Sequence, residues 1–388
     1  MMRTAIPGDE LFKKTCAIGQ YYGFVPFAVL AAEARSAPRV ALETKPRPPS
    51  PPTLIPGDAV AASFAGFLSQ CRKARLVGGE GVREPLFTWH SNLAAGRVAP
   101  KRVAVQFHAI GTERALAEAV VIRALAALVA DLFHATPVIR INSMGDRETR
   151  ARYVRELSIF FKRRASVLPE ECVTIAATDA FAAAELAILR QCADILPLST
   201  EYLSDASRRR FEELLEHLEA TGTSYELARD LMSNGAHWND ACFEILVDGR
   251  RVAWGSRYHE LAKQVVGQST PAMGAVLEAQ TSGPVTPLAS PASTRMRFAF
   301  VHIGDEAKRL SLQMAEEFRR AHLSLTQDIG VESLIDQMRH AERRNPAYLL
   351  VMGRKEALEH TVIMRNQQTQ EETILPLLGL TERLKAVV

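Results

Sequence analysis

Residues 102–113 read Arg-Val-Ala-Val-Gln-Phe-His-Ala-Ile-Gly-Thr-Glu, and this stretch decides how the chain is organised. Its first part, Arg102–Ile110, reads as a strand. The apolar periodicity of Arg114–Leu132 then predicts a helix. After that helix comes a second distinctive segment, residues 141–146 (Ile-Asn-Ser-Met-Gly-Asp), and Arg150-x-x-Tyr153 comes next.

Further along, the chain alternates between strand-like and helix-like segments. Phe243–Ala253 reads as one strand, and Leu203–Gly222 reads as a helix that Ser204 and Asp205 can cap and Gly222 can end. Because His217 lies among acidic neighbours, we expect it on the solvated face of this helix. The middle of the chain is therefore mixed.

The C-terminal part has a pattern of its own. Phe298–Ile303 and Tyr348–Met352 read as apolar strands, with Ser324–Gln327 and a helix over Glu332–Arg344 between them. This alternation predicts a small α/β domain with a largely parallel sheet.

Two segments have the composition of irregular chain. Residues 37–57 carry seven prolines, which excludes a helix or a central strand there. Residues 281–294 are rich in Ser, Thr and Pro and have no charge, which is typical of a tether between domains. We therefore expect a core over residues 1–283, a linker over 284–294 and a second domain over 295–388.

Composition excludes several classes of protein. The 388 residues are 47% hydrophobic and 23% charged, with a formal net charge of +3, so the chain is neither disordered nor strongly basic. Five scattered cysteines without a C-x-x-C pair predict neither a disulfide framework nor a zinc site. Charges interrupt the most apolar stretch, residues 116–133, so no membrane span is expected. The first residues lack an apolar signal region, and we expect a cytoplasmic protein.

The strand over Gln106–Glu113 resembles, in sequence, the end of the second class II motif of histidyl-tRNA synthetases, and the segment at 141–153 resembles the one found at the same spacing in that family. The C-terminal part is similar to that family's anticodon-binding domain. The resemblance covers nearly the whole chain and is weakest over Ala28–Lys101. Between these parts, the matching segments keep the family's order: Ala193–Tyr225, Cys242–Glu244, Ser256–Tyr258 and Pro271–Gly274.

This resemblance implies an α+β fold with an antiparallel class II synthetase sheet and helices, followed by an α/β anticodon-binding-like domain. It also implies a homodimer and contact with tRNA. The residues that it places in a remnant pocket for the amino acid or ATP are Gln106, His108, Glu113, Arg257 and Tyr258. Arg97 or Arg102 would be left to contact ATP, and the candidates for tRNA contact are Arg339, Arg343, Arg354 and Lys355.

The sequence departs from the family pattern at four elements that carry chemistry. Activation of an amino acid joins its carboxylate to the α-phosphate of ATP, and arginines and magnesium normally stabilise the charge that develops. Ser233 and Thr281 stand where the resemblance implies arginines. Residues 55–59 and 89–97 likewise lack the expected motif, so we assign no catalytic residue.

Each retained residue also has a plain structural interpretation. Glu113 could be a first-turn residue of the following helix, where negative charge is favoured, and His108 a histidine of the sheet face. Arg257 and Tyr258 could simply finish a turn. The C-terminal cations could form an ordinary solvated face, because Asp336, Glu342 and Glu356 nearly cancel them.

Three functions remain open. The first is a catalytically degenerate synthetase relative that binds tRNA or a partner. The second is an authentic histidine–tRNA ligase, which would need ATP and Mg²⁺. The third is a regulatory subunit similar to that of ATP phosphoribosyltransferase, a family that normally lacks the C-terminal domain. We expect no metal site of the protein's own.

Overall fold

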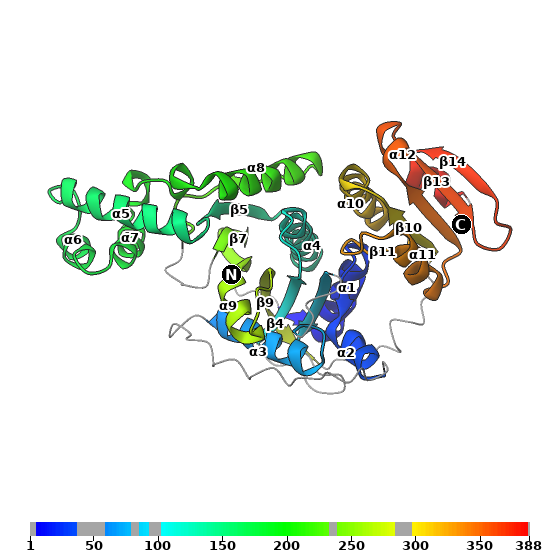
Figure 1. Ribbon diagram of the computed structural model, residues 1–388, viewed down its shortest axis with the longest axis horizontal. Coiled ribbons are helices and arrows are strands. Elements are labelled where there is room, and N and C mark those ends of the chain that lie inside the picture. The colour runs from blue at the N-terminus through cyan, green and yellow to red at the C-terminus, as the bar shows by residue number, and fades with distance from the viewer. Residues whose placement is uncertain are drawn as a thin grey trace.

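The computed structural model describes residues 5–36, 59–78, 85–92, 102–232, 239–283 and 297–386, which fold around two sheets (Figure 1). Within these residues the larger sheet has nine strands in the order β2-β3-β4-β9-β8-β7-β5-β6, with β1 beside β9. Its strands are β1 (Ile6–Pro7), β2 (Val25–Pro26), β3 (Leu86–Ser91), β4 (Arg102–Ile110), β5 (Val138–Ser143), β6 (Glu226–Leu227), β7 (Asn239–Val247), β8 (Arg250–Arg257) and β9 (Ala272–Ser282).

The larger sheet is antiparallel where its strands are long. β3, β4, β9, β8, β7 and β5 pair antiparallel in that order, whereas the two-residue strands β1, β2 and β6 pair in parallel. This confirms the expected antiparallel sheet, and β4 has the bounds predicted from the sequence.

The prediction of one strand over Phe243–Ala253 is wrong, because the chain turns back in its middle. Asp248 (φ 51°) and Gly249 (φ 71°) link β7 to β8 in a hairpin. Two consecutive residues with positive φ give the tight turn whose twist matches that of the flanking strands. The apolar run therefore belongs to two paired strands.

One face of the larger sheet is covered by α1 (Gly8–Tyr21), α4 (Leu116–Phe133) and α8 (Asp205–Ala220). The helices expected over 114–132 and 203–222 are confirmed to within two residues, and Ser204 caps α8 by accepting the Ser207 N–H at 3.2 Å. His217 is only 6% exposed, so its predicted place on a solvated face is wrong.

The other face of the larger sheet carries α3 (Ala59–Lys73) and α9 (His259–Val266). The same apolar cluster continues into a helical arm made of α5 (Arg147–Arg163), α6 (Glu170–Ala176) and α7 (Ala180–Leu189), which projects from the body (Figure 1). Two 3₁₀ turns, Ala193–Ile195 and Ser199–Tyr202, lead from the arm to α8, and α2 (Phe27–Ser36) follows β2. Both faces of the larger sheet are thus covered.

The C-terminal domain is built on the second sheet, whose order is β11-β10-β12-β13-β14. Its strands are β10 (Phe298–His302), β11 (Leu325–Gln327), β12 (Tyr348–Met352), β13 (Thr361–Asn366) and β14 (Glu372–Pro376). The first three pair in parallel, but β12–β13 and β13–β14 are antiparallel, so the expected largely parallel sheet is in fact mixed. The short connection at residues 367–371 cannot cross over the sheet, so it forces an antiparallel pair.

Helices cover both faces of this second sheet. α10 (Asp305–Arg320), α12 (Arg354–Leu358) and α13 (Leu380–Lys385) pack on one face, and α11 (Leu334–Arg343) packs on the other. Ser333, rather than Glu332, begins α11, since its side chain accepts the Asp336 N–H.

The C-terminal domain lies against the core, with α10 next to α1 and α4 (Figure 1). Leu312 of α10 and Ile329 are buried in the same apolar cluster as the core helices. The proline-rich segment 37–57 and the linker 284–294 lie outside the described residues, and the domain boundary stays a prediction.

Candidate functional site

Gln106 and His108 lie on β4, and their side chains face α3. Gln106 Nε2 donates to Ser63 Oγ at 2.6 Å. The ring of His108 stacks on Phe67 at 4.0 Å and on Phe64 at 5.0 Å between ring centroids, and it is 1% exposed. Among the described residues neither ring nitrogen of His108 has a hydrogen-bond partner. Burial holds the pKa of His108 well below its usual range, so its ring is neutral and part of the core.

His90 on β3 extends this stack, and sequence reasoning did not single it out. Its ring lies 4.5 Å from that of Phe67 with an interplanar angle of 7°. Burial lowers the pKa of His90 to about 4, so it too is neutral. Neutral rings therefore fill the sheet face beneath α3.

Arg257 is the last residue of β8 and Tyr258 follows it as the N-cap of α9, and their side chains contact helices on opposite faces of the sheet. Tyr258 is fully buried beside Phe64, with 5.2 Å between the ring centroids. Arg257 is also fully buried, and its guanidinium donates to both carboxylate oxygens of Glu118. Burial opposes the charge on Arg257, but the Glu118 carboxylate more than offsets this and the pKa of Arg257 is raised.

The same guanidinium holds a stretch of backbone. Arg257 Nη1 donates to the carbonyl of Thr112 at 2.9 Å, and Nη2 donates to those of Glu113 at 3.2 Å and Arg114 at 2.8 Å. All its hydrogen-bonding directions face inward, and it fixes the turn between β4 and α4. The charge of Glu118 inside an apolar helix was the sequence signal for this pair, because a buried carboxylate needs a partner.

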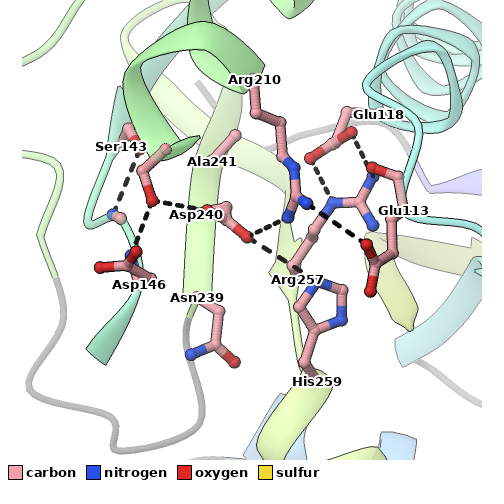
Figure 2. A network of polar contacts seen from close by, with 12 residues as sticks. Glu113, Glu118, Ser143, Asp146, Arg210, Asn239, Asp240, Ala241, Arg257 and His259 are labelled. Carbon is pink, nitrogen blue, oxygen red and sulfur yellow. Dashed lines mark hydrogen bonds and ion pairs between the residues drawn. The ribbon is translucent and has the colours of Figure 1, made fainter. Parts of the chain in front are cut away.

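Glu113 is the one pocket candidate with an exposed side chain, at 67%. Figure 2 shows Arg210 of α8 between Glu113 and Asp240 of β7. Arg210 Nη1 bonds Asp240 Oδ2 at 2.7 Å, while its Nη2 lies 3.8 Å from Glu113 Oε2. The carboxylate of Glu113 is therefore exposed, with the partly buried ion pair of Arg210 and Asp240 behind it.

Asp240, like Arg210, was not revealed by the sequence. It is 6% exposed, has φ 49° and accepts a hydrogen bond from Ser207 Oγ at 3.2 Å. A non-glycine residue in this left-handed conformation is strained, and such strain is often found at functional sites.

His259 faces Asp240 from the start of α9 (Figure 2). Its Nδ1 accepts the Ala272 N–H at 3.1 Å, so the proton of the neutral ring is on Nε2, which lies 3.7 Å from Asp240 Oδ2. Burial, together with Arg257 and Arg210, lowers the pKa of His259 to about 3. No free positive charge is thereby added to the cluster.

The segment at 141–146 positions elements rather than a ligand. Asp146 accepts the Thr149 N–H at 2.8 Å, capping α5, and also accepts Ser204 Oγ–H at 2.6 Å. It thereby ties α5 to the first turn of α8.

Of the two candidate ATP contacts, the structure describes only Arg102. Arg102 is exposed at the start of β4, where it pairs in register with Gln280 of β9. Thr281, the next residue on β9, is buried. Arg97 and Ser233 lie outside the described residues.

The structure divides the candidate tRNA contacts into two pairs. Arg339 and Arg343 lie on α11, and Arg339 is paired with Asp336 at 2.6 Å. Arg354 and Lys355 begin α12, on the other face of the sheet and at the opposite end of β12. The four cations therefore do not form one patch.

Two further properties concern all of the described residues. No helix in the described part of the chain is long and apolar enough to cross a membrane. The same residues contain no group of three His, Cys, Asp or Glu side chains placed to hold a metal ion.

Comparison with known proteins gives matches in both parts of the chain. A family profile described as an anticodon binding domain matches residues 297–386. The histidine–tRNA ligase of Rubrobacter xylanophilus is 30% identical over 245 residues, which is 61% of this chain and 57% of that protein. The ligase of Thermosipho melanesiensis is 26% identical over 69% of this chain and 67% of its own length. The first match thus spans less than two thirds of the relative.

Among solved structures, one described as an ATP phosphoribosyltransferase regulatory subunit/histidyl-tRNA synthetase from Bacillus halodurans is similar with a TM-score of 0.42. It is 14% identical, and the match covers 91% of this chain and 97% of that one. At this level the likeness does not favour either half of that description.

Proposed function

Because this chain belongs to the histidyl-tRNA synthetase family, we propose that it acts by binding tRNA, or a partner, and that its core does not activate histidine. The match of residues 297–386 to an anticodon binding domain supports the RNA-binding half of this proposal. The packing of the core supports the other half.

One observation supports the proposed loss of activation: the arginines and the sheet face near the candidate pocket are already occupied by contacts within the protein. Arg257 and Arg210 are each bonded to a buried carboxylate, and the face at His108 is filled by Phe64 and Phe67. Transfer to the α-phosphate needs donors aimed at the charge that develops there. Neutral stacked rings and an internally neutralised arginine do not provide them.

An active ligase is the second candidate, because Glu113 keeps an exposed carboxylate just beyond the end of β4. In that case ATP and Mg²⁺ would be required, and Arg102 is the described cation nearest in sequence to the pocket residues of that strand. The regulatory-subunit alternative has less support, since residues 297–386 match a domain that such subunits normally lack.

Exchange of pyrophosphate into ATP tests the loss of activation. Purified full-length protein with histidine, ATP and Mg²⁺ should give no more exchange than a sample without enzyme, while a family ligase assayed in parallel should exchange readily. Histidine-dependent exchange clearly above the blank would establish the ligase instead.

The homodimer implied by the resemblance belongs to the same proposal. Sedimentation equilibrium should give the mass of two chains, and a single-chain mass over the whole concentration range would contradict it.

A further inference from the structure

The backbone of the segment Thr112–Arg114 is bound by a buried arginine of the core, and the side chain of Arg114 contacts the C-terminal domain. Arg257, 0% exposed, makes no contact with solvent and donates to the three carbonyls of this segment. Its pairing with Glu118 keeps it in that position. The backbone of Arg114 is thereby fixed relative to the core.

The side chain of Arg114 reaches the C-terminal domain. Its Nη1 donates to Glu332 Oε1 at 2.6 Å, and its Nη2 donates to Asp305 in the first turn of α10. Lys308, only 1% exposed, donates to the same Glu332 oxygen at 2.6 Å. One core arginine thus joins two separate parts of the C-terminal domain.

Beside this contact, the backbone of the C-terminal domain at Gly330 approaches the backbone of the core at Pro85. A Cβ atom added at Gly330 would lie 2.6 Å from the carbonyl oxygen of Pro85 and 2.9 Å from the ring of Phe87. Between the same elements there is a hollow of about 20 Å³, room for about one water molecule. Residue 330 must therefore be glycine for the two domains to lie this close.

We propose that Arg114 locks the C-terminal domain onto the core and that Arg257 is the positioning residue that aims it. Because Glu113, the exposed carboxylate of the remnant pocket, is the neighbouring residue in the same anchored segment, the pocket and the C-terminal domain are mechanically connected. This lock stands independently of RNA binding and of the loss of activation.

Other contacts between the two domains remain when the Arg114 ion pairs are broken. Arg319 pairs with Asp131 through bonds of 2.7 and 2.9 Å, and Tyr22 donates to Glu316 at 3.0 Å. Breaking the lock should therefore increase the open population rather than release the domain completely.

Thiol labelling measures this opening directly in the full chain. Leu312→Cys places a thiol in the cluster shared by both domains, whereas Leu350→Cys places one inside the C-terminal domain alone. Mass spectrometry distinguishes both from the native cysteines. Arg114→Glu should speed labelling at 312 about tenfold, because two ion pairs are lost and the new carboxylate repels Asp305 and Glu332, and it should leave labelling at 350 unchanged.

Rescue and control variants test whether loss of the Arg114 ion pairs causes the faster labelling at position 312. Adding Asp305→Arg to Arg114→Glu should return labelling at 312 toward the starting rate, and Gly330→Val should speed it without any change of charge. Arg152→Glu, which reverses a surface arginine paired with Glu148 in the arm, should have no effect. Unchanged labelling at 312 in Arg114→Glu, or equal acceleration at 312 and 350, would overturn the lock.

A separate set of variants tests the role of Arg257. Arg257→Lys keeps the charge but lacks the planar fork that reaches three carbonyls, so it should speed labelling at 312. If that variant does not fold, Glu118→Gln loosens the guanidinium with a smaller change. Labelling at 312 that stays at the starting rate in a folded variant would show that Arg257 does not position Arg114.

Discussion

At the scale of single residues, the buried ion pair between Arg257 and Glu118 is the interaction on which the centre of the core depends most. Both side chains are 0% exposed, so neither charge can be satisfied by water when the other is removed. Surface pairs such as Arg152–Glu148 are screened and replaceable, and they contribute little. Two Arg–Glu pairs therefore differ in their contribution to stability because one is buried and the other is exposed.

Glu118→Ala should lower the free energy of unfolding by about 3–5 kcal/mol, because it leaves Arg257 charged and buried without its partner. Urea denaturation measures this, and Glu148→Ala, which breaks an exposed pair, should cost less than about 0.5 kcal/mol. Similar losses in the two variants would mean that Arg257 finds water or another anion.

The neutral histidines, of which His90 is partly buried, predict how stability depends on pH. His90 has a folded pKa of about 4 against an ordinary value of 6.5, so the unfolded chain binds its proton first. Stability from this group is full above pH 6.5 and falls as the pH drops toward 4, by about 2 kcal/mol between pH 7 and pH 5.

Urea unfolding at pH 7 and pH 5 checks this expectation with a variant. His90→Phe keeps a flat ring against Phe67 but cannot titrate, so its loss of stability between the two pH values should be smaller by that amount. An identical pH dependence in the variant would assign the effect to other groups.

At the scale of elements, helix caps bind separate parts of the core together. Ser204 accepts the Ser207 N–H at the start of α8 and donates to Asp146, which itself caps α5. One serine side chain thus serves two helices. Ser333, which begins α11 at the surface with a longer 3.4 Å bond, serves only its own helix.

Ser204→Ala should therefore destabilise the protein by about 1–2 kcal/mol, more than Ser333→Ala, which should cost about 0.5 kcal/mol. Thermal unfolding of the two variants side by side provides the comparison. Equal shifts in midpoint would show that the bond from Ser204 to Asp146 adds nothing.

At the scale of the whole molecule, the placement of the C-terminal cations limits how RNA could be held. Arg339 and Arg343 lie on one face of the second sheet, and Arg354 and Lys355 lie on the other face, at the carboxyl end of β12. Ligands of sheets with parallel strands are usually bound at such carboxyl ends. We therefore expect Arg354 and Lys355 to carry phosphate contacts.

Filter binding with bulk tRNA at several salt concentrations tests this. Replacing both Arg354 and Lys355 by Gln should lower the slope of log affinity against log salt by about 1.4–1.8, at 0.7–0.9 per phosphate. The matched pair Arg339→Gln with Arg343→Gln should change it little, and Glu113→Ala should leave binding nearly as it was.

Two further outcomes bear on the same expectation. A chain ending at residue 283 should lose binding, because the proposed contacts are all C-terminal. No complex at low salt, or equal binding by that truncated chain, would move the proposal to a protein partner or a regulatory role.

The sequence by itself determined what depends on local order. The strand Arg102–Ile110 and the helices near 114–132 and 203–222 follow from apolar periodicity and caps, and they were predicted closely. The family resemblance of 106–113 and 141–153 gave the antiparallel sheet. The hairpin within 243–253 was missed, although Asp248-Gly249 followed by two arginines is the kind of turn signal that joins two strands.

Only the tertiary structure decided what each retained side chain does. Arg257 was assigned to a pocket by its motif, yet the distant Glu118 and the carbonyls of 112–114 surround it. His217 was expected in solvent, but it is 6% exposed, and Gln313 of the C-terminal domain donates to the carbonyl of Ala220 at the end of the same helix. A charge pattern along the chain does not show which side chain of another helix or strand will pair with a given residue. That information exists only once helices such as α4, α8 and α10 pack together, because burial and pairing are set by neighbours distant in sequence.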